Sequence, residues 1–98
     1  MSLREPFFRA VAGIGSDTER RIVLSRVLDG EASEAVVLGA LRLAAGMSSD
    51  TEKRIVLHEV PAQRLRSQGV TAAYRRVVGT MSSDSERALA LRRLITAQ

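Results

Sequence analysis

Apolar residues recur along this chain at the three-to-four-residue spacing of amphipathic helices. Three Ala-rich stretches, near residues 6–12, 33–45 and 71–78, show that spacing. Three more stretches begin near residues 17, 50 and 84, and each carries an apolar stripe behind a polar first turn. No stretch of useful length alternates apolar and polar residues with the period of a strand. The pattern predicts an all-α protein, with an irregular linker or a short helical turn over residues 64–69.

The helical stretches belong to three copies of one sequence unit. The phrase Ser-Asp-x-Glu occurs three times, and its aspartates lie 33 and then 34 residues apart. Many flanking positions match by type at the same spacing, which indicates a tandem repeat. The repeats lie within a single domain, 1–98, and span about residues 6–30, 33–61 and 69–98.

Each copy carries a start signal for its second helix. A serine is followed three residues later by a glutamate, as in a capping box, where the serine oxygen accepts from the glutamate N–H and the glutamate side chain returns to the serine N–H. An aspartate between them lies in the first turn, where the positive end of the helix dipole favours it. The predicted structural caps are Ser16, Glu19, Ser49, Glu52, Ser83 and Glu86.

Glycine and proline mark the predicted ends of the helices. Gly13, Gly46 and Gly79 precede the three boxes and predict short left-handed turns between antiparallel helices. The first two capped helices are predicted to end before Gly30 and before Pro61. Because one helical hairpin cannot bury its apolar stripe alone, three hairpins are expected to stack into a short right-handed α-solenoid with a 33–34-residue repeat.

The repeated phrase also resembles a known kind of repeat. Residues 47–57 and 81–91 read Met-Ser-Ser-Asp-x-Glu followed by basic and aliphatic residues, and residues 14–24 carry the same phrase with Ile14 in place of Met and Gly15 in place of the first Ser. This phrase resembles the HEAT-like and armadillo-like α-helical repeats in a short bacterial form. The resemblance implies a scaffold for protein contacts, often as part of a longer protein, and it brings no catalytic residue.

Composition excludes most catalytic chemistry. The 98 residues include no cysteine, one histidine and three aromatic residues, so thiol nucleophiles, thiolate metal sites and imidazole pairs are absent. His58 shares its repeat position with Ser25 and Arg92, which predicts an exposed side chain. Since capping accounts for the recurring carboxylates, we expect no enzyme activity, catalytic residue, metal or cofactor, unless other parts of a larger chain supply the chemistry.

The chain shows no targeting or membrane segment. No apolar run approaches the ~20 residues of a membrane span, and the N-terminus lacks the pattern of a signal peptide. The expected location is the cytoplasm, without membrane insertion.

Basic residues recur at fixed repeat positions, although the net charge is only +4. Stacked repeats would turn these positions into stripes, and the candidate partner-binding residues are Arg9, Arg42, Arg76, Arg20, Lys53 and Arg87. Three alternatives are open: pairing with the acidic first turn of the same or the next helix, binding of an acidic protein segment, or binding of nucleic acid. The absence of interleaved aromatic residues argues against single-stranded nucleic acid. We therefore expect a non-catalytic helical-repeat scaffold for a protein or peptide, with nucleic-acid binding through the Arg stripes as the alternative.

The two ends of the stack are expected to be apolar and adhesive, since neither carries a polar capping repeat. The sequence predicts a homodimer, end-to-end stacking, or contact with further repeats. The expected contact residues are Phe7, Phe8, Leu91 and Ile95.

Overall fold

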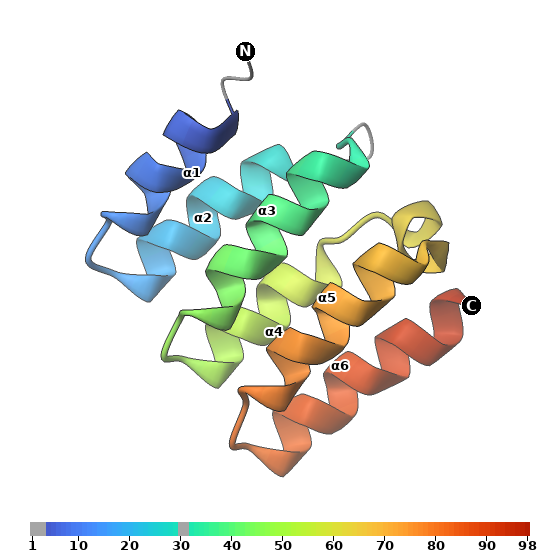
Figure 1. Ribbon diagram of the computed structural model, residues 1–98. Helices are drawn as coiled ribbons and strands as arrows, with labels where there is room; N and C mark the ends of the chain where they lie inside the picture. The colour runs from blue at the N-terminus through green and yellow to red at the C-terminus, as the bar shows by residue number, and fades with distance from the viewer. Residues whose placement is uncertain (1–3, 30–31) are drawn as a thin grey trace.

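The computed structural model describes residues 4–29 and 32–98 (Figure 1). These two ranges contain helices and no strand, so the all-α prediction is confirmed. The elements are α1 (Arg4–Ala12), α2 (Asp17–Val27), α3 (Glu34–Ala45), α4 (Asp50–His58), the 3-10 helix η1 (Ala62–Arg66), α5 (Gln68–Gly79) and α6 (Asp84–Ala97).

The α-helices form two layers. In one layer α1 packs on α3 and α3 on α5, and in the other α2 packs on α4 and α4 on α6. Short turns join α1 to α2, α3 to α4 and α5 to α6, and they lie along one edge of the molecule, at the lower left in Figure 1. The molecule measures 35 × 27 × 18 Å.

Two helix boundaries differ from the predicted ones. Of the two alternatives over residues 64–69, the short helical turn is present as η1, and α5 begins directly after it at Gln68, where Ser67 Oγ accepts from Val70 N at 3.4 Å. Gly69 lies inside α5, although glycine is a poor helix former, because the cap and the tertiary packing outweigh its propensity. The helix α2 ends at Val27, and the predicted stop at Gly30 lies outside the described residues.

The prediction of left-handed glycine turns is wrong. No glycine in the described ranges has a positive φ, and Gly46 itself has φ −88° and ψ −3°. The end of α3 instead tightens into 3-10 hydrogen bonds, from Gly46 N to Leu43 O at 3.0 Å and from Met47 N to Ala44 O at 3.1 Å. The extended backbone of Ser49 then completes the reversal, so no left-handed residue is required.

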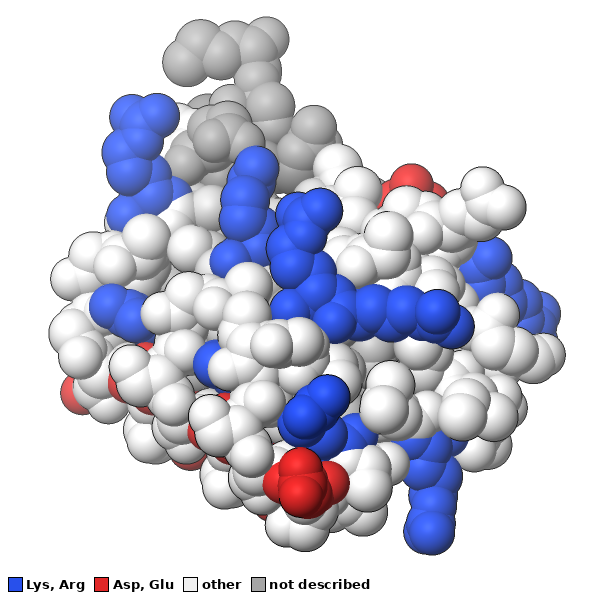
Figure 2. All heavy atoms as spheres, turned by 60° about the horizontal axis from the view of Figure 1, so that its bottom comes forward, with Lys and Arg blue, Asp and Glu red and all other residues white. Residues whose placement is uncertain are grey.

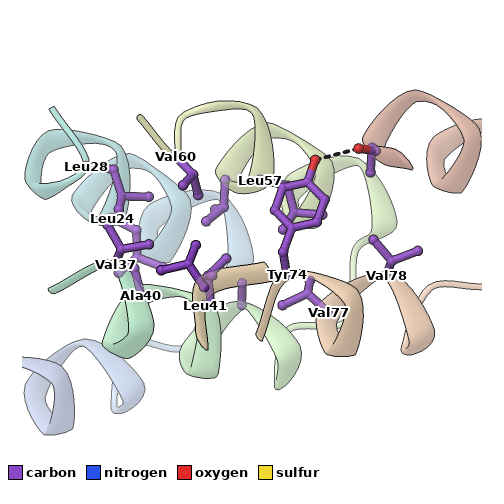
Figure 3. Packing of buried hydrophobic residues seen from close by; sticks show 14 of the residues in the cluster. Leu24, Leu28, Val37, Ala40, Leu41, Leu57, Val60, Tyr74, Val77 and Val78 are labelled. Carbon is purple, nitrogen blue, oxygen red and sulfur yellow. Dashed lines mark hydrogen bonds between the residues drawn. The ribbon is translucent and has the colours of Figure 1, made fainter. Parts of the chain in front are cut away.

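The hydrophobic core fills the space between the two layers (Figure 3). Phe8 and Tyr74 are its aromatic members, and the others are aliphatic residues together with Met47 and Met81. The Tyr74 hydroxyl donates to Ala90 O of α6 at 2.5 Å, and burial raises the pKa of Tyr74 to about 12.

Phe8 is not an exposed contact residue, contrary to the prediction. Phe8 is 5% exposed, and its ring lies against Gly39 in the middle of α3. The missing side chain of Gly39 makes room for the ring, so Phe8 attaches α1 to α3. Phe7, Leu91 and Ile95 are exposed, as expected.

Candidate interaction surface

The serine half of each predicted capping box is present in the structure. Each serine oxygen accepts a hydrogen bond from the backbone N–H three residues further along. The bonds run from Glu19 N to Ser16 Oγ at 3.4 Å, from Glu52 N to Ser49 Oγ at 3.2 Å and from Glu86 N to Ser83 Oγ at 3.3 Å.

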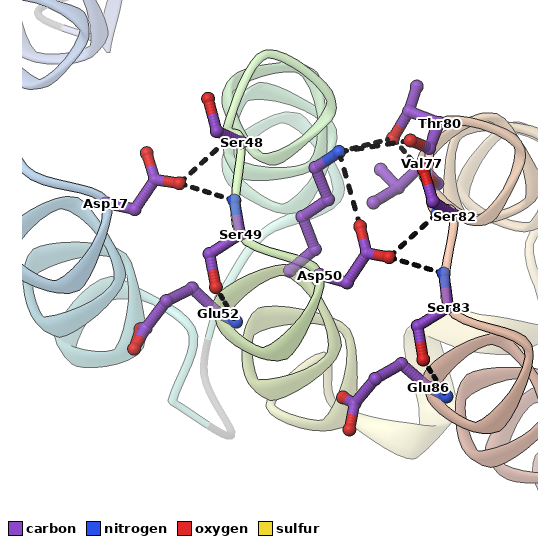
Figure 4. Close-up of polar contacts among 11 residues, drawn as sticks. Asp17, Ser48, Ser49, Asp50, Glu52, Val77, Thr80, Ser82, Ser83 and Glu86 are labelled. Atoms are coloured by element: carbon purple, nitrogen blue, oxygen red, sulfur yellow. Dashed lines mark hydrogen bonds and ion pairs between the residues drawn. The ribbon is translucent and has the colours of Figure 1, made fainter.

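The glutamate half of the box is wrong at α4, because a carboxylate of the preceding helix pair takes its place. Asp17 of α2 accepts from Ser48 N at 2.7 Å and from Ser49 N at 2.6 Å through the same oxygen (Figure 4). Glu52 therefore does not return to the N–H of its own cap. The start of α4 is capped by its own serine and by the neighbouring pair.

The same arrangement recurs at α6. Asp50 accepts from Ser82 N at 2.7 Å and from Ser83 N at 2.6 Å, and Glu86 does not return to its cap (Figure 4). The hydrogen bond from Ser83 N holds the pKa of Asp50 below its ordinary value of 3.8, since it stabilises the charged form. Burial opposes this shift, while Ser82 N and the nearby Lys53 support it.

The displaced glutamates form ion pairs between neighbouring helix pairs. Arg21 Nε lies 2.8 Å from Glu52 Oε2, and Arg54 Nε lies 2.6 Å from Glu86 Oε2. Pairing with an acidic first turn was one of the alternatives for the basic residues. Arg21 and Arg54 follow it, each with the glutamate in the first turn of the next capped helix. In the third copy, Ala88 stands where this arginine is expected.

We use the term polar ladder for these repeated contacts between capped helices. Its members are Asp17, Arg21, Ser48, Ser49, Glu52, Asp50, Arg54, Ser82, Ser83 and Glu86. The contacts are long-range in sequence, at separations of 31 to 33 residues, so they fix how one helix pair sits on the next.

Two of the three residues of the predicted basic stripe on the capped helices are not exposed. Arg20 donates to Ile14 O at 2.5 Å and to Ala12 O at 3.3 Å, closing the turn before α2. Lys53 is 4% exposed, and its Nζ donates to Thr80 Oγ1 at 3.0 Å and to Thr80 O at 3.3 Å. Each also pairs with the aspartate of its own first turn, Arg20 with Asp17 at 3.5 Å and Lys53 with Asp50 at 4.0 Å, which is the same-helix pairing that the sequence left open. Of this set only Arg87 is exposed.

The predicted basic positions on the other layer are exposed. Arg9 of α1, Arg42 of α3 and Arg76 of α5 all present their side chains to solvent, as does the neighbouring Arg75. Figure 2 shows basic side chains spread over one face of the molecule, with the acidic ones towards its margins. We call Arg9, Arg42, Arg75 and Arg76 the arginine face.

Two hollows lie beside Arg42. One, of about 220 Å³, is lined by Ala12, Arg20, Arg42, Leu43 and Gly46. The other, of about 170 Å³, is lined by Leu38, Leu41, Arg42, Ala73 and Arg76. Each hollow combines arginine side chains with aliphatic walls. Sequence periodicity does not predict these hollows, because both form between helices of different copies.

His58 is half-buried, contrary to the prediction of an exposed side chain. Burial lowers the pKa of His58 from 6.5, because it disfavours the charged form. The charges of Arg54 and Arg93 lower this pKa further, whereas the Leu89 backbone and the charge of Glu86 raise it. Its Nε2 is buried and has no hydrogen-bond partner among the described residues. The neighbouring α6 covers this position on α4, whereas the equivalent Arg92 on α6 is exposed.

Neither a metal site nor a membrane span is found in the described part of the chain. Residues 4–29 and 32–98 contain no group of three or more acidic or histidine side chains arranged to hold a metal ion. In the same ranges, no helix has the length and apolar character needed to cross a bilayer.

Comparisons with protein-family models, with curated proteins and with solved structures gave no match for this chain.

Proposed function

We propose that this chain is a non-catalytic helical-repeat module whose arginine face binds an acidic segment of another protein. The proposed architecture is a short α-solenoid of three hairpins, similar to HEAT-like and armadillo-like repeats. The polar ladder supports this architecture, because Asp17 and Asp50 make the same pair of hydrogen bonds to the next hairpin.

The arginine face is the observation that carries the proposed function. Arg9, Arg42 and Arg76 occupy one repeat position on three helices, and all three are exposed. An arginine guanidinium presents a planar fork of donors that matches a carboxylate. A row of such forks suits a segment with carboxylates at regular intervals.

The hollows between these helices add a preference for apolar side chains. Leu38, Leu41 and Ala73 line one hollow together with Arg42 and Arg76. An aliphatic side chain of the partner would enter this hollow while neighbouring carboxylates meet the guanidinium groups. We therefore propose an acidic segment that also carries small aliphatic residues, and nucleic acid is the alternative partner because phosphates match the same forks.

A fluorescence anisotropy titration tests this proposal. The probes are a labelled peptide of repeated Glu-Glu-Leu triplets and a labelled double-stranded oligonucleotide of similar charge. The test variant is Arg9→Ser/Arg76→Ser, and the matched control, Arg26→Ser/Arg92→Ser, removes two exposed arginines from the other layer.

The proposal expects the peptide to bind the natural chain, with a loss of about tenfold or more in the test variant and little change in the control. Equal losses in both variants would indicate a net-charge effect and contradict a specific face. Tighter binding of the oligonucleotide, with a steep dependence on salt, would favour the nucleic-acid alternative.

A further inference from the structure

The capped helices contact one another through the same repeat positions at both junctions. On each helix, one side carries the aspartate and the aliphatic residues that the next pair covers. The opposite side receives the preceding pair. We call the surface of α1 and α2 that faces away from α3 and α4 the α2 side, and the surface of α5 and α6 that faces away from them the α6 side.

The α6 side repeats the surface that is buried at the earlier junctions. Leu91 and Ile95 occupy the repeat positions of Leu24 and Leu28, which are 0% and 3% exposed under the next pair. In α6 the same positions are 37% and 73% exposed. Asp84, at the repeat position of Asp17 and Asp50, has no partner among the described residues.

The α2 side carries the complementary groups. No described residue accepts a hydrogen bond from Gly15 N or Ser16 N, whereas the equivalent Ser48–Ser49 and Ser82–Ser83 amides are bound by an aspartate. Glu19 is exposed, whereas its counterparts Glu52 and Glu86 each bind an arginine of the preceding pair.

Arg26 adds a further donor on the α2 side. At the equivalent position in α6, Arg93 reaches back to the preceding pair and donates to Val60 O at 2.8 Å. Arg26 is exposed and has no partner among the residues that the structure describes. The carbonyl equivalent to Val60 O on the α6 side is Leu94 O.

We propose that the α6 side of one copy of this chain binds the α2 side of a second copy, head to tail. In this contact Asp84 accepts from the Gly15 and Ser16 N–H groups, as Asp17 and Asp50 do within the chain. Leu91 and Ile95 are buried against α2 of the second copy. The interface continues the packing seen at both internal junctions and does not involve the arginine face.

One position departs from the repeated pattern and provides a sharp test. Ala88 stands at the repeat position of Arg21 and Arg54, so α6 offers no arginine at this position to pair with Glu19 of the second copy. Arg87 and Arg92 are both exposed on α6, and Arg87 shares its repeat position with Lys53, which binds the next pair. Ala88→Arg restores the missing ion pair and should tighten self-association by about two- to fivefold, the range for an exposed pair. Adding Glu19→Gln should remove this gain.

Sedimentation equilibrium of the natural chain measures the association itself. Because each head-to-tail contact leaves one α2 side and one α6 side free, the average mass should rise steadily with concentration beyond that of a dimer. A mass that stays at one monomer up to millimolar concentration would overturn the proposal, and so would a rise that stops at a dimer.

Two blocked variants separate a head-to-tail contact from a symmetric one. Glu19→Arg/Ile22→Arg adds positive charge to the α2 side, where it opposes Arg92. Asp84→Asn/Ile95→Arg removes the carboxylate and the most exposed apolar group of the α6 side. All four substituted residues are exposed, so circular dichroism should show a natural helix content in both variants.

Each blocked variant should be monomeric alone, because it retains only one competent side. An equal mixture of the two should form a one-to-one dimer and nothing larger, through the intact α6 side of the first and the intact α2 side of the second. A variant that dimerises by itself, or a mixture that remains monomeric, would overturn the head-to-tail arrangement. The variant Arg9→Ser/Arg76→Ser should associate like the natural chain.

Discussion

Replacing Gly39 with alanine is expected to destabilise the protein by loosening α1 from α3. Gly39 is buried in the middle of α3 and supports the ring of Phe8. A methyl group at this position would lie 2.7 Å from Phe8 Cζ and 2.8 Å from Phe8 Cδ2, with Cε2 closer still. Real carbon contacts of this kind are longer, so the ring has to move out of its site.

Two effects of opposite sign set the size of the change. Overpacking a core site costs about 1–3 kcal/mol. Alanine in place of glycine inside a helix stabilises the protein by about 1 kcal/mol through its higher helix propensity. The net loss is about 1 kcal/mol, which lowers the melting temperature by about 4–8 °C for a domain of this size.

The effect of Gly39→Ala on the free energy of unfolding should change sign once the Phe8 ring is removed. In a Phe8→Ala background the added methyl group meets no ring, so Gly39→Ala should raise stability by up to about 1 kcal/mol through helix propensity. Gly79→Ala is the matched control, since a methyl group at this helical position meets nothing within 4 Å. Thermal and urea unfolding followed by circular dichroism measure the natural chain, the two single variants, the double variant and the Gly79→Ala control.

Destabilisation of similar size in both backgrounds would refute the role of the Phe8 ring, and so would a stabilised Gly39→Ala in the natural background.

Three further predictions concern charged and titrating groups. Tyr74 is the only tyrosine and its pKa is raised to about 12, so tyrosinate absorbance of the folded protein should show ionisation near pH 12. The stability that this group contributes is fully present below pH 10 and should be lost as the pH rises towards 12. An ionisation midpoint near pH 10 in the folded protein would contradict the burial of Tyr74. Because the pKa of His58 is lowered from 6.5, the unfolded chain takes up the proton first as the pH falls, and the melting temperature should decrease below about pH 6.5. The same decrease in a His58→Gln variant would contradict this origin. For Arg54 and Glu86, whose side chains are 23% and 19% exposed, a double-mutant cycle in urea should give a coupling of about 0.5–1 kcal/mol, and a coupling of zero would contradict the ion pair.

Much of the fold was predictable because its signals are local. The serines that begin α2, α4 and α6 precede their helices in sequence, and their oxygens accept from a backbone N–H only three residues away. The aliphatic spacing of residues 33–45 likewise matches α3, Glu34–Ala45. Both signals depend on residues within one or two helical turns, so no knowledge of neighbouring helices is needed.

The partner of each ladder carboxylate could not be predicted in this way. The phrase Ser-Asp-x-Glu offers two carboxylates, and the local rule assigns Glu52 to its own cap. In the structure Asp17 takes that N–H group from 32 residues away, because the preceding helix pair lies close enough to do so. The available signal was the recurrence of Arg21 and Arg54 four residues after each aspartate, together with the loss of that arginine at Ala88.

Basic positions were misjudged for a related reason. Arg20, Lys53 and Arg87 share one repeat position, yet the structure places them in three environments: against turn carbonyls, buried beneath the next turn, and in solvent. The next helix pair makes the difference, since Lys53 binds Thr80 of that pair and Arg87 has no such neighbour in the described ranges. Sequence register therefore predicts which side of a helix a residue occupies, and the covering element decides whether it is exposed.

The polar ladder links formation of the capped helices to their stacking. Helix starts leave N–H groups without partners, and α4 and α6 each complete theirs with a carboxylate from the preceding helix pair. An isolated pair lacks this carboxylate, so its capped helix gains this part of its stabilisation, beyond its own serine cap, only when the preceding pair is folded. Aliphatic contacts alone allow neighbouring helices to slide by a turn, whereas an aspartate that must meet two adjacent N–H groups accepts one position. Asp84 and the N–H groups before α2 have no such partner among the described residues, so the proposed contact with a second copy would be held to one register by the same requirement.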